Sequence, residues 1–276
     1  MAPPRPDERS GSCLSVSGYS DVTTTTPAIK PIKEIGGFFA MSLDAMVAAL
    51  APPFAFREFV EQTWFVTRVS LLPTILMTIP FLCLTVFLLN LLIIEVGAAD
   101  ASGAGAALGA VLYIGPVVTV LVISGAGATA MCADLGSRTI REEIDALRVL
   151  GLNPVHRLVV PRVLAATLVA TMLTSLVIVV GLFFGFLFSV YVQGVNPGAY
   201  IASLTLLVGI PELIIALSKA LLFGFFAGLI ACYKGLSVGG GPQGVGNAVN
   251  ETVVFTFITL FLVSTITTIV GAKATL

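Results

Sequence analysis

Charged residues are scarce in this chain. Only 11% of its 276 residues are Asp, Glu, Lys or Arg, whereas 57% are hydrophobic. A soluble domain of this size carries about a quarter charged residues, so the composition excludes an ordinary soluble protein and predicts a polytopic membrane protein. The net charge of −1 does not bear on nucleic-acid binding, because the few charges are segregated by position. We expect no nucleic-acid partner.

Histidine and paired cysteines, common sources of catalytic and metal chemistry, are nearly absent. His156 is the only histidine, which excludes a catalytic triad and a multi-histidine metal site. We interpret it as a polar residue at the cytoplasmic face rather than a ligand. The four cysteines, Cys13, Cys83, Cys132 and Cys232, form no CxxC pair. The last three lie in or at the ends of apolar segments and are expected to be small core residues. We predict a non-catalytic chain with no metal and no cofactor.

Nucleotide-binding sequences are also missing. There is no GxxxxGK[ST] sequence, so the chain is not expected to hydrolyse ATP itself. Residues 239–244 formally match GxGxxG, but they follow an apolar segment rather than a strand and do not indicate a dinucleotide site. Residues 1–28 are rich in Pro, Ser, Thr and Gly without an apolar run, which predicts a disordered tail.

Long hydrophobic runs, by contrast, are abundant. A spanning helix needs about 20 predominantly apolar residues. We therefore predict an all-α polytopic membrane protein with five transmembrane helices. The shorter segment Ala199–Gly209 is either an external surface segment or an extension of a neighbouring span. The five expected spans are Leu71–Ile94, Ala106–Met131, Val163–Tyr191, Pro211–Tyr233 and Thr252–Val270.

Lysine and arginine predict the orientation of these spans. All of them except Lys219 and Lys273 lie in the chain up to Arg68, in the loop 132–162, or at Lys234. The intervening loops contain none. By the positive-inside rule, the N-terminus and the loop 132–162 are expected to be cytoplasmic and the C-terminus external, in the cell membrane.

The region 29–69 is expected to form N-terminal interfacial helices. After Pro52 and Pro53, apolar residues recur on one side of a helix while charged residues occupy the others. With Trp64 near the headgroup level, this pattern predicts an amphipathic helix lying in the membrane interface. The alternative is that the segment is the cytosolic start of the first span. The apolar residues are Phe56, Phe59, Val60 and Trp64.

A short charged segment, Thr139–Leu150, interrupts the apolar sequence after the second span. Thr139 and Glu142 match a capping box, and Gly151 supplies a stop. Ile140, Ile144 and Leu147 recur at helical spacing opposite the charges. We predict a capped amphipathic helix that contacts a soluble partner through Arg141, Glu142, Glu143, Ile144, Asp145, Leu147 and Arg148.

Small residues recur at four-residue spacing within two spans, and such spacing lets helix backbones approach closely. The pattern predicts tight packing but does not separate packing within the chain from dimerisation. A Gly-rich segment follows the fourth span and forms either sharp turns or a plain flexible connector. The small residues are Gly181, Gly185, Ser189, Ala220, Gly224 and Gly228, and the Gly-rich segment includes Gly240, Gly241, Gly244 and Gly246.

Glu212 and Lys219 are ionisable residues inside or at the edge of the fourth span. Seven residues apart, they share a face but are separated by about 10 Å along the axis, too far to neutralise each other. Glu212, directly after Pro211, is either functional or an external interfacial charge. For Lys219 we expect a functional or inter-helix role, because buried membrane charges face the bundle interior or a wet cavity.

Two sequence motifs, in the order in which they occur in this chain, resemble those of the MlaE/YrbE family, whose members are permease subunits of ABC-type lipid transporters. The family pattern AELG…TEQIDAL.VMG.(D/N)P is matched by Ala133–Gly136, Arg141–Leu147, Val149–Gly151 and Asn153–Pro154. The pattern CY.G…GG..GVG.A is matched by Cys232–Tyr233, Gly235, Gly240–Gly241, Gly244–Gly246 and Ala248. Lys219–Ala220 with Phe223–Gly224 resembles the family's LVKAFVFG, and Gly115–Pro116 falls where the family has GPV. The resemblance covers about residues 35–270.

The resemblance implies that residues 70–276 are a permease domain and that the charged helix couples it to a separate ATPase. Such a subunit moves lipid across the cell membrane with ATP hydrolysed by a dimeric cytosolic chain. The opening IKEIGGFFAMSLDAM is more similar to the YrbE branch of Mce complexes than to MlaE. In those complexes two non-identical YrbE chains pair, and Mce proteins form a tunnel outside.

Two departures from the family pattern bear on the substrate and the partner. Ser124–Ala126 stands where many members have AGR, which removes an arginine near the lipid path, and Glu143 replaces the usual glutamine. We therefore expect an apolar-dominated lipid such as a fatty acid or a sterol. The residues expected to line its path are Phe81, Leu84, Leu88, Val122 and Leu221.

Two other classes of function remain open. An ion- or proton-driven carrier would need several carboxylates within the membrane, and the spans offer at best Glu212 with the border residues Glu95 and Glu251. Five spans also do not divide into equal inverted repeats. The residue pattern does not exclude a non-transporting scaffold of an envelope complex.

Overall fold

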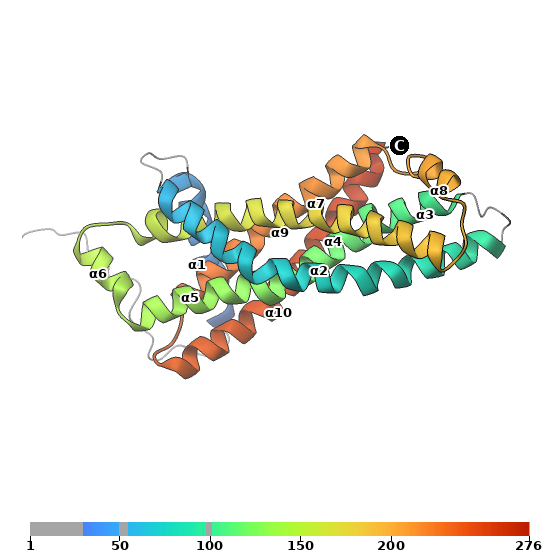
Figure 1. The fold of residues 1–276 in the computed structure, drawn as a ribbon. Coiled ribbons are helices and arrows are strands. Elements are labelled where there is room, and N and C mark those ends of the chain that lie inside the picture. The colour runs from blue at the N-terminus through green and yellow to red at the C-terminus, as the bar shows by residue number, and fades with distance from the viewer. Residues whose placement is uncertain (1–29, 50–54, 96, 98–100, 276) are drawn as a thin grey trace, which may run out of the picture. The chain divides into compact units, whose positions relative to one another are not determined.

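The computed structural model describes residues 30–49, 55–95, 97 and 101–275 (Figure 1). The chain divides into two units, Met1–Gly37 and Phe38–Leu276. In the first unit only the helical backbone from Lys30 onwards is described, so the expected disordered tail of residues 1–28 lies outside the described residues. The architecture below is that of the second unit, whose described residues form helices and loops.

Five helical stretches are long and apolar enough to cross a membrane, as predicted. Together with the shorter helix α1 (Lys30–Ala49), they confirm the all-α, five-span fold. The first, fourth and fifth spans are single helices: α2 (Phe56–Glu95), α9 (Ile210–Leu236) and α10 (Pro242–Thr275). The third span consists of the π-helical turn η4 (Val155–Val159) followed by α7 (Val160–Tyr191).

The second span is a composite helix in which α-helical and π-helical turns alternate. Its parts are continuous from Ser102 to Ile140, and most of its apolar length is buried by the other helices. π-Helical turns are rare and concentrate at functional sites. The parts are α3 (Ser102–Leu108), η2 (Gly109–Ile114), α4 (Gly115–Val122), η3 (Ile123–Gly127) and α5 (Ala128–Ile140).

The segment from Phe56 to Arg68 forms the first turns of α2 and not a separate helix. The prediction that this segment lies as its own helix in the membrane interface is therefore wrong, and the alternative, the start of the first span, is correct. No helix-breaking residue stands between this segment and Leu71. Side-chain pairs one turn apart support the helix instead, as when Arg57 Nε donates to Glu61 Oε1 at 3.0 Å.

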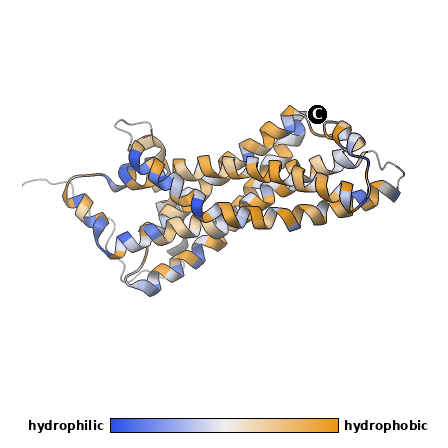
Figure 2. Ribbon diagram, viewed as in Figure 1, coloured by the Kyte–Doolittle hydropathy of each residue, from blue (hydrophilic) through white to orange (hydrophobic). Residues whose placement is uncertain are grey.

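The helices have two distinct ends. The short helix α6 (Glu143–Val149) lies at one end and α8 (Pro197–Ser203) at the other (Figure 1); we call these the α6 end and the α8 end. Between them the long helices are predominantly hydrophobic (Figure 2). α8 is a separate helix, so the apolar segment 199–209 does not extend a neighbouring span.

Small residues allow the closest helix contacts, and they do so within this chain. A Cβ on Gly224 of α9 would lie 2.5 Å from the backbone oxygen of Ala166 on α7. On the other side of α7, a Cβ on Gly181 or Gly185 would approach the Leu82 side chain of α2 to 3.0 or 3.2 Å. Both stripes of small residues therefore serve packing inside the chain.

Candidate functional site: the α6 end

α6 begins at a sharp turn rather than at the expected capping box. α5 continues through Thr139 to Ile140, and Thr139 Oγ1 donates to the carbonyl oxygens of Leu135 (2.9 Å) and Gly235 (3.0 Å). The residue before α6 is Glu142, at φ = +59°, the one described non-glycine residue in the left-handed region. The capping-box prediction is wrong because Thr139 is held inside α5 and against α9.

The C-terminal end of α6 confirms the predicted stop. Gly151 has φ = +74°, and its N–H donates to the Arg148 carbonyl at 3.0 Å. The Leu152 N–H donates to the Leu147 carbonyl at 3.0 Å. These two bonds form a Schellman motif, which satisfies the last carbonyl groups of the helix. A backbone turn with a positive φ therefore precedes α6 at Glu142, and another follows it at Gly151.

One face of α6 packs against the bundle. Ile144 is buried and Leu147 is half-buried, and they pack in an apolar cluster with Leu135 and Leu158 from the helices on either side. Ile144, which was expected to contact the partner, thus anchors α6 to its own chain in this structure. The remaining expected contact residues are exposed: Arg141, Glu142, Glu143, Asp145 and Arg148.

The exposed face of α6 combines ion pairs with an apolar tip. Arg148 Nη1 lies 2.8 Å from Asp145 Oδ1. At the tip, Val149 and Leu150 are 88% and 73% exposed. Neither residue is among the contact residues expected from the sequence, although their position off the Ile144 face and just before the Gly151 stop is a signal for exposure. An exposed apolar patch next to charged residues is typical of protein–protein contacts.

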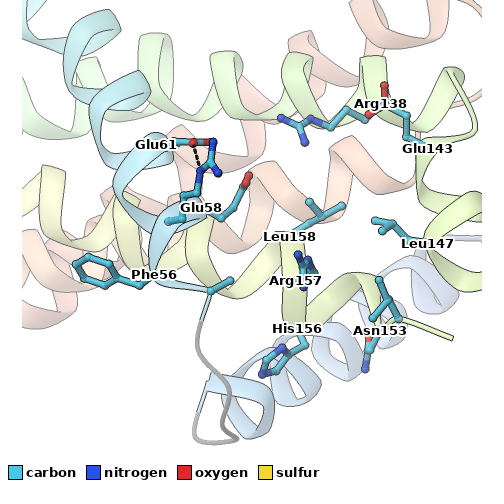
Figure 3. Close-up of a pocket in the computed structure, with 13 residues that line it drawn as sticks. Phe56, Glu58, Glu61, Arg138, Glu143, Leu147, Asn153, His156, Arg157 and Leu158 are labelled. Atoms are coloured by element: carbon cyan, nitrogen blue, oxygen red, sulfur yellow. Dashed lines mark hydrogen bonds and ion pairs between the residues drawn. The ribbon is translucent and has the colours of Figure 1, made fainter. Parts of the chain in front are cut away.

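A cavity of about 900 Å³ separates α6 from the beginning of α2 (Figure 3). Its wall has acidic and basic side chains in equal number, together with apolar ones, so it does not select for one sign of charge. His156 is half-buried in this wall. The lining residues are Ala55, Phe56, Arg57, Glu58, Glu61, Arg138, Glu143, Leu147, Leu152, Asn153, His156, Arg157 and Leu158.

Arg162, at the start of α7, is a buried charge of the α6 end. Its side chain is 0% exposed, and Nη2 lies 2.6 Å from Asp134 Oδ2 of α5. Nη1 donates to the Leu158 carbonyl at 3.0 Å, and Glu58 Oε1 of α2 lies 3.8 Å from Nη2. From the sequence alone Arg162 is only one of the cations of the loop 132–162, because nothing local marks a partner 28 residues away.

The two sequence motifs meet at this end. The Thr139–Gly235 hydrogen bond joins them, and a Cβ on Gly136 would lie 3.0 Å from Val238 Cγ2. A second hollow of about 540 Å³ lies where they meet, lined by Ser137, Ile140, Arg141, Pro242 and Val245. The structure thus brings together segments that are about a hundred residues apart in the sequence.

Sharp backbone turns explain part of the Gly-rich segment. Gly241 has φ = +86°, and a Cβ on Gly244 would overlap the Gly239 carbonyl oxygen. Gly240 and Gly246 have open space around them. The segment is therefore a specific turn leading into α10, and glycine is structurally required at Gly241 and Gly244.

Glu212 and Lys219 have separate roles. Glu212 Oε2 accepts a hydrogen bond from the Gly209 N–H at 2.8 Å and so caps the start of α9. Lys219 is 2% exposed, and its Nζ donates to Thr268 Oγ1 of α10 at 3.0 Å. Lys219 thus makes the inter-helix contact that was one of its two expected roles.

The residues expected to line a lipid path lie on two kinds of surface. Phe81, Leu84 and Leu88 are exposed on one face of α2, and Leu221 is exposed on α9. Val122, by contrast, is 2% exposed and belongs to the core. Four of the five therefore face outwards, where lipid or another chain can contact them.

Neutral polar groups hold the α8 end. Asn90 of α2 is buried, and its Nδ2 donates to Ser189 Oγ at 3.1 Å and to Gln193 Oε1 at 2.5 Å. The ring of Tyr200 in α8 packs edge-on against Phe186, 5.4 Å between centroids. Burial raises the pKa of Tyr200 to about 12, and its hydroxyl has no hydrogen-bond partner among the described residues.

Five helices long and apolar enough to cross a membrane, with the short helix α6 between the second and third, define a multi-pass membrane protein. Residues 59–270 match the family model for Permease MlaE, and the chain belongs to this family of ABC transporter permeases. It is 31% identical to a probable ABC transporter permease protein of Rickettsia bellii over 227 residues, 82% of this chain and 87% of the relative.

Other relatives match shorter stretches. A probable ABC transporter permease protein of Synechocystis is 32% identical over 166 residues, 60% of this chain and 63% of the relative. The protein TRIGALACTOSYLDIACYLGLYCEROL 1, chloroplastic, of Arabidopsis thaliana is 32% identical over 149 residues. That match spans 54% of this chain and 43% of the relative.

Proposed function

We propose that this protein is the membrane-spanning subunit of a Mce-like ABC transporter, moving lipid across the cell membrane with ATP hydrolysed by a separate chain. The observation that carries the proposal is the surface of α6. It is delimited by a turn at each end, anchored by Ile144, and exposes the Arg148–Asp145 ion pair beside Val149 and Leu150. Such a surface suits a soluble protein, and membership of a family of ABC permeases makes that protein an ATPase.

In the proposed orientation the N-terminus and α6 are cytoplasmic and the C-terminus is external. The support is the positive-inside rule, because arginines cluster in the segment 138–162 whereas none lies between Tyr191 and Glu212. Single cysteines in a cysteine-free background test it: Leu150→Cys at the α6 end and Tyr191→Cys, at an 80% exposed position, at the α8 end. An impermeant thiol reagent applied to intact cells should label Tyr191→Cys and not Leu150→Cys. Labelling of Leu150→Cys alone would show that the orientation is the opposite of the one proposed.

The proposed coupling runs through the chain connections of α6. α5 leads into α6, and η4 leads from it into α7, so a movement of α6 acts on the second and third spans directly. The cavity between α6 and α2 leaves room for such a movement (Figure 3). In this mechanism the ATPase rocks α6 and thereby opens and closes a lipid cavity between two permease chains.

The proposed substrate is an apolar-dominated lipid such as a fatty acid or a sterol. Support comes from the outward-facing Phe81, Leu84 and Leu88, since apolar transfer from water is favoured by about 25 cal/mol per Å². The absence of an arginine at 124–126 disfavours a large charged headgroup. The Arabidopsis relative is named for a glycerolipid, which supports a lipid substrate in general.

Photoreactive lipids test the substrate class. A fatty acid or sterol probe should crosslink to the first, second or fourth span of the assembled complex. Crosslinks confined to α7, or a strong preference for a phospholipid probe, would show that the proposed substrate is wrong. Mass spectrometry of lipid that co-purifies with the complex gives an independent identification.

The proposed partners are a second YrbE-type permease chain, a dimeric cytosolic ATPase and Mce proteins on the outer side. The chain should be purified with its partners from membranes and assayed for ATP hydrolysis with and without lipid. We expect lipid to stimulate hydrolysis. A chain that binds no ATPase, or a complex in which lipid neither stimulates hydrolysis nor is transferred, would instead favour an ion-coupled carrier or a scaffold.

A further inference from the structure

We infer that Arg162 is a positioning residue that clamps the two stems of α6 together, so that a displacement of α6 moves the second and third spans as one body. This inference rests on the proposed function in one respect, namely that α6 receives its movement from an ATPase. The stems are the end of α5, which enters α6, and the start of α7, which leaves it through η4.

The position of the pair in the chain makes it a clamp. Asp134 lies on α5 before the turn at Glu142, and Arg162 lies on the first turn of α7. The whole of α6, with the turns on both of its sides, lies between them. The Arg162–Asp134 contact therefore closes the base of a loop whose tip is the exposed docking surface.

Arg162 binds through both terminal nitrogens of its guanidinium group where the two stems meet. Nη2 faces Asp134 Oδ2 at 2.6 Å, while Nη1 donates to the Leu158 carbonyl at 3.0 Å within its own stem. Glu58 of α2 lies 3.8 Å from Nη2, and Arg138 Nε lies 3.4 Å from the same Asp134 oxygen. Two cations and two anions thus balance across three helices.

Burial makes this contact persistent. The side chain of Arg162 is 0% exposed, whereas Asp134 and Glu58 are 27% and 24% exposed. Separating the pair would leave a buried guanidinium without its carboxylate, which is strongly unfavourable. The Arg148–Asp145 pair on α6 differs, because its side chains are 53% and 67% exposed and it can open at little cost.

The contact also requires arginine rather than just a positive charge. The planar guanidinium reaches Asp134 and the Leu158 carbonyl in different directions at once. Lysine has a single ammonium group on a flexible stem and cannot reproduce this geometry. The clamp therefore predicts that Arg162→Lys preserves the charge but loosens the stems.

Transport per ATP is the first test. Asp134→Asn, Arg162→Lys and the exchange Asp134→Arg with Arg162→Asp are compared with wild type, each assembled with its ATPase in lipid vesicles. The matched control is Glu251→Gln, which removes the carboxylate of the 2.8 Å Lys234–Glu251 pair between α9 and α10. We expect Asp134→Asn to lower lipid transferred per ATP hydrolysed about ten-fold, with hydrolysis itself within about two-fold of wild type. The exchange should restore part of the loss, and the control should have no effect.

Spin labels provide a second test that needs neither ATPase nor substrate. Nitroxides at Ser137→Cys on α5 and Leu164→Cys on α7 report the distance between the stems of the isolated chain in lipid. The distance distribution should be narrow in the wild-type background and broad with Asp134→Asn or Arg162→Lys. If the wild-type complex transfers no lipid, the proposed function is wrong. The widths of the spin-label distance distributions in wild type and variants still test whether Arg162 holds the two stems together.

Three results would overturn the inference. The first is an unchanged transfer ratio together with an unchanged distance distribution in Asp134→Asn. The second is an equal loss in Glu251→Gln, since that would indicate general destabilisation. If Asp134→Asn does not fold, Arg162→Lys replaces it as the deciding variant, because it keeps the buried charge. The third result that would overturn the inference is a distance distribution in Arg162→Lys as narrow as that of wild type.

Discussion

The two ends of the bundle hold the same pair of helices by different chemistry. At the α6 end, α2 meets α7 through Glu58 and Arg162, within a cluster of buried and half-buried charges. At the α8 end, α2 meets α7 through Asn90 and Ser189, which are neutral. The α6 end also has the 900 Å³ cavity and the exposed tip of α6.

In the proposed mechanism this difference distinguishes the α6 end, which receives movement from the ATPase, from the α8 end. The exposed Arg148–Asp145 pair on α6 can open at little cost beside the docking surface, while the buried Arg162–Asp134 contact holds the base of α6 together. Neutral hydrogen bonds need close, well-aligned atoms and so favour one arrangement. We therefore expect variants at the α6 end to affect coupling and variants at the α8 end to affect stability.

Charge reversal on α6 should have the largest effect. Glu142→Lys combined with Asp145→Lys should reduce co-purification of the ATPase at least about ten-fold, because lysines would replace two of the carboxylates that α6 exposes at the proposed contact. Membrane insertion should be unchanged, since both residues are exposed. The matched control at the α8 end is Glu95→Lys, also at an exposed position. Unchanged co-purification and transport in the double variant would contradict the docking role of α6.

Loss of the buried amide at the α8 end should have the next largest effect. Asn90→Ala should lower the free energy of unfolding by about 2 kcal/mol, because Ser189 and Gln193 lose their shared donor. ATPase association should be unchanged. Unfolding in detergent measures the first quantity, and Thr85→Val, whose hydroxyl bonds only within α2, is the control. An Asn90→Ala variant that is as stable as wild type but no longer binds the ATPase would contradict the expectation that the α8 end affects stability and the α6 end affects coupling.

Removal of the Tyr200 hydroxyl should stabilise the α8 end slightly. Tyr200→Phe should raise the free energy of unfolding by about 1 kcal/mol, because a buried hydroxyl without a partner is removed. Because the folded pKa of about 12 lies above the ordinary value near 10, wild type also loses stability as pH rises between these values. Tyr200→Phe should lack this loss. The exposed Tyr191→Phe is the control, and a clear destabilisation by Tyr200→Phe would mean that the hydroxyl has a partner.

Relief of backbone strain at the turn before α6 should have the smallest effect. A non-glycine residue in the left-handed region lowers the free energy of unfolding by about 1–2 kcal/mol. Replacing it with glycine removes this strain but adds an entropy cost of about 0.5–1 kcal/mol, because the unfolded chain becomes more flexible. Glu142→Gly should therefore stabilise the chain by about 0.5 kcal/mol. Glu143→Gly, inside α6, should destabilise it, because glycine is a poor helix former. Thermal unfolding of the two variants should give shifts of opposite sign, and shifts of the same sign would argue against strain at Glu142.

The sequence predicted the larger elements better than their junctions. The five spans follow from long apolar runs, and the end of α6 follows from Gly151, whose positive φ glycine adopts without strain. The segment from Phe56 to Arg68 has the composition of an interfacial helix yet continues into α2. The Thr139–Glu142 spacing matches a cap, but both residues lie where the path of α5 decides their conformation.

The candidate site was predictable only in part, for the same reason. The charged residues of α6 are contiguous in the chain, so their pattern marks them as an exposed surface. The anchoring role of Ile144 and the exposure of Val149 and Leu150 depend on how α6 lies against the bundle. The cavity is formed by segments from α2, α5, α6 and η4, which no local pattern brings together.

By itself, the sequence determined the membrane class, the number of spans and the existence of a charged segment, ended by Gly151, between the second and third. These properties depend on apolar length and on local turn chemistry, which are independent of distant residues. The tertiary structure alone decided that Arg162 pairs with Asp134, that Thr139 meets Gly235, and that Gly224 packs against Ala166. A buried charge or a bare backbone surface can accept any complementary group that the packing of the helices brings near, so its partner is chosen by three-dimensional proximity and not by spacing along the chain.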